Sequence, residues 1–93
     1  MVCLMPVTVK VELFGIPRAR AGVAQTISTG NDLGDILTDM ASRFPQLAIS
    51  CIQGRHLKPG FTANLSGHRF VTDPDTLLRE GDSVLILSLD AGG

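Results

Sequence analysis

The sequence contains no tryptophan and no tyrosine, and four phenylalanines are the only aromatic residues among its 93. A hydrophobic core must therefore be built mostly from leucine, isoleucine and valine. No apolar stretch approaches the roughly 20 residues that a membrane-spanning helix needs, so we expect no membrane partner. The opening segment, MVCLMPVTV, lacks the basic start and the cleavage site of a secretory signal peptide, and we expect a cytoplasmic protein.

Neither sign of charge dominates, since the formal net charge is −1. Basic residues gather only loosely, at Arg18 and Arg20 and again at Arg55, His56 and Lys58, with no aromatic residues between them. Proteins that bind nucleic acids usually present a basic patch, often interleaved with aromatic residues. The sequence therefore predicts no nucleic-acid partner.

Cysteine and histidine are also scarce, with two of each. Cys3 and Cys51 lie far apart, which favours two free thiols over a disulfide. His56 and His68 lack companion ligands at metal-binding spacing, so no metal site is expected. A nucleophilic pair of Cys51 and His56 has no third residue to orient it and no helix N-terminus to activate the thiol. The Lys and Ser or Thr of a phosphate-binding loop are missing, so we expect no bound cofactor.

Hydrophobic periodicity predicts most of the secondary structure. Residues 7–13 alternate between apolar and polar, which indicates a half-buried strand. Residues 15–22 contain Gly and Pro and are interpreted as a turn or loop, followed by a weaker strand over 23–28 with Val23 and Ile27 on one face. These two strands are expected to pair as an antiparallel hairpin.

The next segment changes to a helical period, with an apolar stripe formed by Leu33, Ile36, Leu37, Met40 and Phe44. Asn31 or Asp32 can cap its N-terminus, and Asp35 favours the positive end of the helix dipole. Pro45 limits the helix because the residue before a proline is driven out of the helical region.

The remaining chain reads as further strands. Residues 46–60 have no clear pattern, whereas 61–65 and 68–71 look like two strands joined at Ser66–Gly67. Residues 72–82 form a loop with room for one helical turn, and Asp73 before Pro74 favours a turn there. The last strand, 83–89, is apolar on both faces, which places it in the middle of a sheet.

The predicted order is therefore two strands, one main helix and three strands. The economical arrangement is an α+β fold with the helix packed across one face of a mixed sheet. The first and last strands then pair in parallel through a right-handed crossover, as in the β-grasp (ubiquitin-like) fold. We expect one domain over residues 1–93, with a flexible tail at 90–93.

Four features resemble the ubiquitin-like sulfur carriers of the MoaD/ThiS type, which include the small subunit of molybdopterin synthase and the thiamine-pathway carrier. The first strand runs into LFG at 13–15, and the helix begins within STGNDLGDIL at 28–37. A Leu-x-x-Gly-Asp-x-Val motif follows at Leu78, Gly81, Asp82 and Val84. Finally, the printed sequence closes on Gly92–Gly93.

The resemblance implies a protein cosubstrate, not an enzyme. An adenylyltransferase related to ubiquitin-activating enzymes would use ATP to convert the Gly93 carboxylate to an acyl-adenylate. Sulfur from a sulfurtransferase or cysteine desulfurase would then give a thiocarboxylate, and a synthase would accept the sulfur. Asp90 and Ala91 would form the tail that enters the partner. Gly92 and Gly93 suit a narrow channel because they lack Cβ atoms.

Several alternatives stay open. The activated glycine could instead acylate lysines, which would make the protein a modifier. The domain could also be a β-grasp interaction module with an irrelevant tail. Phe61, Leu65 and Phe70 are interpreted either as a partner-binding sheet face or as ordinary core. The sequence does not select a pathway, such as molybdopterin or thiamine biosynthesis.

Overall fold

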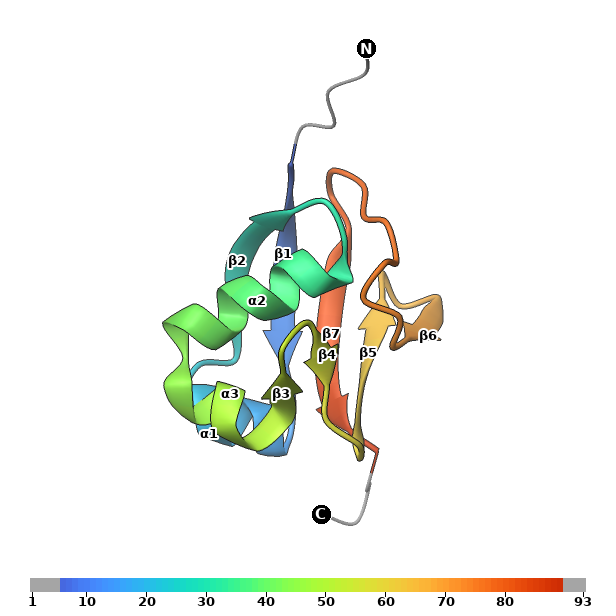
Figure 1. Cartoon of the computed structure of the whole chain (residues 1–93). Helices are drawn as coiled ribbons and strands as arrows, with labels where there is room; N and C mark the ends of the chain where they lie inside the picture. Colours follow the sequence, from blue (N-terminus) through green and yellow to red (C-terminus); the bar gives the residue numbers. More distant parts are fainter. Residues whose placement is uncertain (1–5, 90–93) are drawn as a thin grey trace.

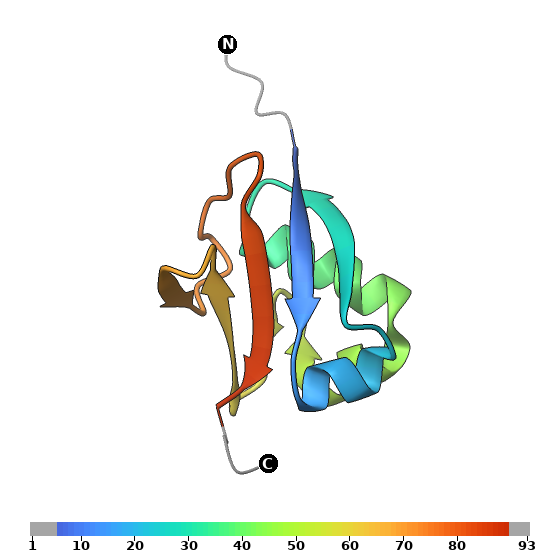
Figure 2. The ribbon, with the colours of Figure 1, turned by 180° about the vertical axis from the view of Figure 1, so that it is seen from behind.

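The computed structural model describes residues 6–89, which contain a five-stranded mixed sheet in the order β2-β1-β7-β5-β6. Strands β1 and β7, the first and last along the chain, pair in parallel, and the other neighbours are antiparallel (Figures 1 and 2). This topology confirms the predicted β-grasp arrangement, with the last strand in the middle of the sheet. The strands are β1 (Val7–Leu13), β2 (Gln25–Gly30), β5 (Phe61–Leu65), β6 (Arg69–Val71) and β7 (Ser83–Ser88).

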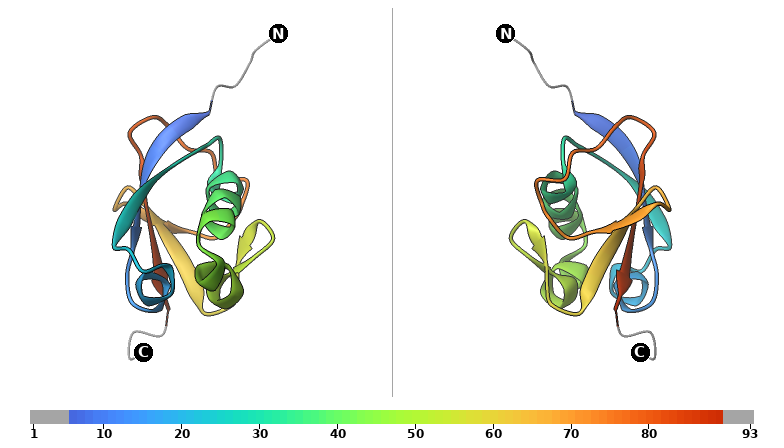
Figure 3. Two further views of the ribbon diagram at one scale, coloured as in Figure 1. Left: turned by 90° about the vertical axis from the view of Figure 1, so that its left-hand side faces the viewer. Right: turned by 90° about the vertical axis from the view of Figure 1, so that its right-hand side faces the viewer.

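The main helix, α2 (Leu33–Arg43), lies across one face of the sheet (Figure 3). Asp32 caps it as predicted, since its carboxylate accepts the N–H of Asp35 at 2.9 Å. Of the predicted stripe, Leu33, Ile36, Leu37 and Met40 are fully buried against the inward side chains of β1, β5 and β7. Phe44, its last member, lies just beyond α2 as the C-cap residue and is only partly buried. None of the helices in the described part of the chain is long and apolar enough to cross a bilayer.

The loop predicted at 15–22 is wrong, because residues Ile16–Ala21 form the short helix α1. The Gly and Pro residues that were interpreted as signs of a loop lie at the ends of this helix. Gly15 and Gly22 have φ values of 69° and 81°, and Pro17 lies in the first turn, where its missing N–H costs nothing. The sequence signal was therefore a pair of helix ends, not a loop.

The second strand begins two residues later than predicted and buries different positions. Its core-facing residues include Ser28 and Gly30, whereas Val23 precedes the strand and Ile27 is 63% exposed. The Ser28 hydroxyl donates to Asp39 at 2.6 Å, which satisfies it in the core. Because the buried face carries a serine and a glycine, hydrophobicity could not identify it.

The unassigned segment 46–60 folds into α3 (Pro45–Cys51) and a small hairpin of β3 (Ile52–Gln53) and β4 (His56–Leu57). Pro45 ends α2 as predicted, but it also opens α3.

The turns predicted at Ser66–Gly67 and at Asp73 are both present in the structure. Ser66 and Gly67 both have positive φ, as a tight hairpin turn requires. Asp73 forms a turn by accepting the Asp75 N–H at 2.9 Å, and residues 72–82 contain no helical turn.

Candidate functional site

The predicted reactive tail, Asp90, Ala91, Gly92 and Gly93, lies outside the described residues. The described part of the site is the end of β7, from which this tail continues. There Leu89 donates its N–H to the Gly60 carbonyl at 2.7 Å, and Phe61 lies opposite Ser88. Phe14 donates its N–H to Ile86 at 3.0 Å on the other side. The strand is thus held on the β1 edge as far as Ile86 and on the β5 edge as far as Leu89, the residue before the tail.

The start of β7 is fixed by the Gly-Asp motif. One carboxylate oxygen of Asp82 accepts the Ser66 hydroxyl and the other accepts the Arg79 N–H, both at 2.8 Å. Gly81 has a φ of 89°, which a side chain would strain. Leu78 and Val84, at the two ends of the motif, are buried in the core. The motif therefore sets the register of β7 and, through it, the place where the tail leaves the sheet.

The sheet face opposite α2 and α3, here called the open face, carries no helix along its strands (Figures 2 and 3). Val84 and Ile86 point to the core, so Leu85 and Leu87 point to the open face, where both are half-buried. Phe70 is 65% exposed, and Phe14 and Leu89 are similarly exposed near the end of β7. We call Phe14, Phe70, Leu85, Leu87 and Leu89 the open-face patch.

The two interpretations of Phe61, Leu65 and Phe70, as a partner-binding sheet face or as ordinary core, apply to different residues of the three. Leu65 belongs to the core, and Phe61 is partly buried against it. Phe70 is instead paired with Asn64, whose neighbours Ala63 and Leu65 point the other way. Alternation along β5 and β6 causes this split. Phe70 alone of the three lies on the open face, and sequence reasoning missed Leu85 and Leu87, whose alternation with Val84 and Ile86 was the available signal.

Basic side chains lie near the end of β7, where the tail begins. Arg18 and Arg20 are exposed on α1, which lies beside the end of β1 in Figure 2. Neither guanidinium forms an ion pair or a side-chain hydrogen bond within residues 6–89. The surroundings of the tail's origin are therefore apolar on the sheet and cationic on α1.

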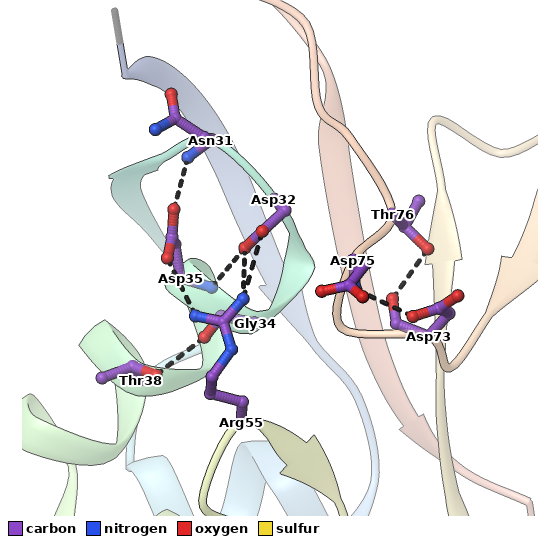
Figure 4. Close-up of polar contacts among 9 residues, drawn as sticks. All are labelled: Asn31, Asp32, Gly34, Asp35, Thr38, Arg55, Asp73, Asp75 and Thr76. Atoms are coloured by element: carbon purple, nitrogen blue, oxygen red, sulfur yellow. Dashed lines mark hydrogen bonds and ion pairs between the residues drawn. The ribbon is translucent and has the colours of Figure 1, made fainter. Parts of the chain in front are cut away.

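A second polar cluster surrounds the N-terminus of α2 (Figure 4). The Arg55 guanidinium, from the β3–β4 turn, donates to Asp32 at 3.0 and 3.1 Å and to Asp35 at 3.0 Å. The Asn31 N–H donates to Asp35 at 2.8 Å, and this bond, together with Arg55, lowers the pKa of the Asp35 carboxyl. The same ion pairs raise the pKa of Arg55. The charged groups of the cluster pair with one another, so the cluster stabilises the packing of the β3–β4 hairpin against α2.

Cys51 is fully buried at the end of α3, and desolvation raises the pKa of its thiol. His56 is exposed on β4. Burial and a raised pKa both disfavour the reactive thiolate, so the geometry does not support nucleophilic chemistry at Cys51. Among residues 6–89, no group of three or more His, Cys, Asp or Glu side chains is arranged to hold a metal ion. Cys3 lies outside the described residues.

Comparison with known proteins relates this architecture to solved structures. No protein-family model matches the chain, and no curated protein does either. Small archaeal modifier protein 1 from Methanosarcina acetivorans superposes with a TM-score of 0.77 at 24% identity, covering 95% of this chain and 98% of that one.

Two further solved structures are similar. A candidate molybdopterin converting factor subunit 1 from Pyrococcus furiosus gives a TM-score of 0.71 at 24% identity, covering 88% of this chain and 97% of that one. A chain of the BexX/CysO complex from Amycolatopsis orientalis gives 0.75 at 21% identity, covering 91% and 99%. These similarities support the β-grasp fold that the sequence predicted.

Proposed function

We propose that this protein is a sulfur carrier whose Gly93 carboxylate is adenylylated by a partner enzyme and then converted to a thiocarboxylate. One observation carries the proposal: the central strand of a ubiquitin-like sheet leads directly into a tail that closes on two glycines. The protein would act as a cosubstrate, and ATP would be used by the activating partner.

The physical argument concerns the reactivity of a carboxylate. It is a poor electrophile until a good leaving group is attached, so activation needs a second protein that binds ATP. The tail must reach into that protein's site, and glycines without Cβ atoms can pass a narrow channel. The Asp90–Ala91 segment would be the linker between the end of β7 and the reacting carbonyl.

The partner would also need a surface to bind beside the tail, and the open-face patch could be this surface. Its exposed side chains, Phe14, Phe70 and Leu89, lie on or beside the last strands of the sheet. Exposed large apolar side chains on one face of a sheet are typical of protein interfaces. The unpaired Arg18 and Arg20 could add electrostatic attraction to an acidic partner.

Intact-mass spectrometry tests the proposal directly. The purified protein is incubated with ATP, magnesium, an adenylyltransferase encoded in the same genome and a sulfur source. Replacing one terminal oxygen by sulfur adds about 16 Da, the expected product of acyl transfer to sulfide. The spectrum of the untreated protein also establishes whether the chain ends at Gly93.

Two variants sharpen this test. Deleting Gly93, or adding one alanine after it, should abolish the mass shift, because the activated carboxylate is removed or displaced. Deleting residues 1–5 is the matched control and should leave the reaction intact. An unchanged mass with every adenylyltransferase of that genome, or a shift that persists without Gly93, contradicts the proposal.

A second function is favoured by one comparison, since one of the similar structures is named a small archaeal modifier protein. The same activated Gly93 could acylate lysine side chains instead of passing sulfur. Cells that produce an N-terminally tagged chain should then show tagged adducts of higher mass that withstand thiol treatment and disappear when Gly93 is deleted. A carrier would show none.

A further inference from the structure

A groove of about 620 Å³ lies at the opposite end of β7 from the tail. It runs between the β5–β6 turn and the loop that precedes β7, and it is separate from the open-face patch. Leu65, opposite Val84, lines the groove, whereas Ser88 at the other end of β7 lies opposite Phe61. Val84 and Ser88 are four residues apart, which corresponds to about 13 Å along a strand.

The floor of the groove is apolar. Leu65 and Leu78 are almost completely buried at its base, and Leu77 stands 67% exposed between them and solvent. The backbone around Leu77 is fixed, because Leu77 forms a β-bridge with Asp32 and the next N–H, that of Leu78, donates to Asn31 at 3.0 Å. A rigidly held, exposed leucine above a buried apolar floor offers a site for one apolar side chain.

The rim of the groove is cationic. His68, Arg69 and Arg79 line it, and neither arginine side chain forms an ion pair or a hydrogen bond within the part of the chain that is described. The one carboxylate in the lining, Asp82, uses both oxygens internally. The free polar groups of the rim are therefore donors, and they complement carboxylates.

Other carboxylates stand near the groove but do not line it. Asp73, Asp75 and Glu80 lie on the same loop outside the lining; Asp73 accepts the Asp75 N–H, and Glu80 accepts the Thr8 N–H at 3.4 Å. Asp32 and Asp35, which flank the loop on α2, are paired with Arg55 (Figure 4). The electrostatic preference of the groove is thus set by Arg69 and Arg79.

The adjoining strand favours an extended ligand. β6, which contains Arg69, pairs only with β5 among the described strands, so it forms an edge of the sheet (Figure 1). An edge strand presents unpaired N–H and C=O groups that an extended peptide can join. Backbone pairing would supply affinity, and the groove would select the side chains.

We propose that this groove binds an extended acidic segment of a partner protein. An apolar side chain of that segment packs on Leu77, and flanking carboxylates pair with Arg69 and Arg79. Since the groove and the tail lie at opposite ends of β7, the segment can be bound while the tail enters another site. The proposal needs no chemistry at Gly93 and stands whichever function the tail has.

The test uses the full chain labelled with nitrogen-15 and a synthetic peptide of alternating leucine and aspartate residues, acetylated and amidated at its ends. Titration followed by NMR should shift the amide signals of Ser66–Arg69 and Thr76–Arg79. The changes should be small elsewhere, including at Phe14 and Leu89. A peptide with asparagine in place of aspartate should bind at least about tenfold more weakly, because two charged pairs are lost.

Charge variants supply the controls. The double variant Arg69→Glu, Arg79→Glu should weaken binding by about tenfold or more, since two attractions become repulsions. Arg18→Glu with Arg20→Glu makes the same charge change on α1 and should alter binding by less than about twofold. Leu77→Ser should weaken binding without unfolding the protein, because the side chain is exposed. Unchanged circular dichroism confirms that each variant is folded.

Three outcomes would overturn the proposal. One is the absence of any shift at millimolar peptide. Another is equal weakening by the two charge variants, which would mean that only net charge matters. The third is an equal response of the same amides to inorganic phosphate, which would make the groove a simple anion site.

Discussion

Replacing Gly30 by alanine tests how closely β2 approaches the first turn of α2. An alanine Cβ at this position would lie 2.5 Å from the Cβ of Asp35 and 3.5 Å from its carbonyl carbon. Carbon atoms in contact are normally about 3.5–4.0 Å apart, so the strand or the helix must move by about 1 Å. Asp35 cannot turn away, because its Cβ is fixed to the backbone of α2.

The expected loss of stability follows from these contacts. Overpacking of this kind costs about 1–3 kcal/mol, and a displaced Asp35 would also weaken its hydrogen bond from Asn31, worth about 0.5–1.5 kcal/mol. We therefore expect Gly30→Ala to lower the free energy of unfolding by about 2–4 kcal/mol. For a chain of this size, such a loss is a large part of the total.

Gly34→Ala is the matched control, because it introduces the same methyl group in the first turn of α2, next to Asp35. The atoms nearest to its Cβ would be those of the Arg55 guanidinium, at 2.5 Å, and this flexible, exposed side chain can swing aside. Losing such exposed ion pairs costs little, and alanine gains about 1 kcal/mol over glycine in a helix. The net change should therefore be small.

Urea unfolding followed by far-ultraviolet circular dichroism measures both variants, since the chain has no Trp or Tyr for fluorescence. With a denaturant slope of about 1–3 kcal/mol per molar urea, the Gly30→Ala midpoint should fall by roughly 1–3 M. A midpoint within error of the parent would refute the close approach of β2 and α2. So would an equal loss in Gly34→Ala.

Three other predictions follow from the described residues. Because the folded-state pKa of Asp35 lies below its ordinary value of 3.8, its charge stabilises the fold above that pH, and the effect is lost as pH falls through the folded value. Asp35→Asn should therefore cost about 0.5–1 kcal/mol at pH 7 in urea unfolding, and progressively less below pH 3.8. Cys51 should react with iodoacetamide at least about a hundredfold more slowly in the folded than in the urea-unfolded chain, measured by mass spectrometry, and equal rates would contradict its burial. Phe70→Asp should leave the free energy of unfolding within about 0.5 kcal/mol of the parent but slow adenylylation by the partner, measured as pyrophosphate release. Unchanged kinetics would show that Phe70 is not part of the partner surface.

Long, regular patterns made the central elements predictable. The apolar stripe from Leu33 to Met40 is typical of a helix that packs on a sheet. The run of β7, apolar on both faces, is typical of a strand in the middle of a sheet. The parallel pairing of β1 with β7 then followed from connection rules. These elements are stabilised mainly by the burial of apolar side chains, and hydrophobic periodicity indicates which side chains are buried.

Short elements escaped prediction because they depend on their ends and their surroundings. Helices α1 and α3 have six and seven residues, too few for a clear period, and both are opened by prolines that sequence reasoning took for interruptions. The residues of the open face depend on how the alternation of each strand is placed in the sheet, which the sequence left open for Phe61, Leu65 and Phe70. Phe61 and Leu65 turn inward with Ala63, and Leu85 and Leu87 turn outward. The glycine tail remains a prediction, since it lies outside the described residues.

The pairing of β7 with both β1 and β5 has a consequence for the order of events on the ribosome. Residues 83–88 are translated after the other four strands of the sheet, yet without them the sheet is divided into a β1–β2 pair and a β5–β6 pair with no strand between them. Closure of the core must therefore wait until β7 has been translated, as expected for a topology rich in non-local contacts. Nascent chains that terminate early cannot complete this sheet, so compact, protease-resistant molecules should be those in which translation has passed β7 and reached the tail.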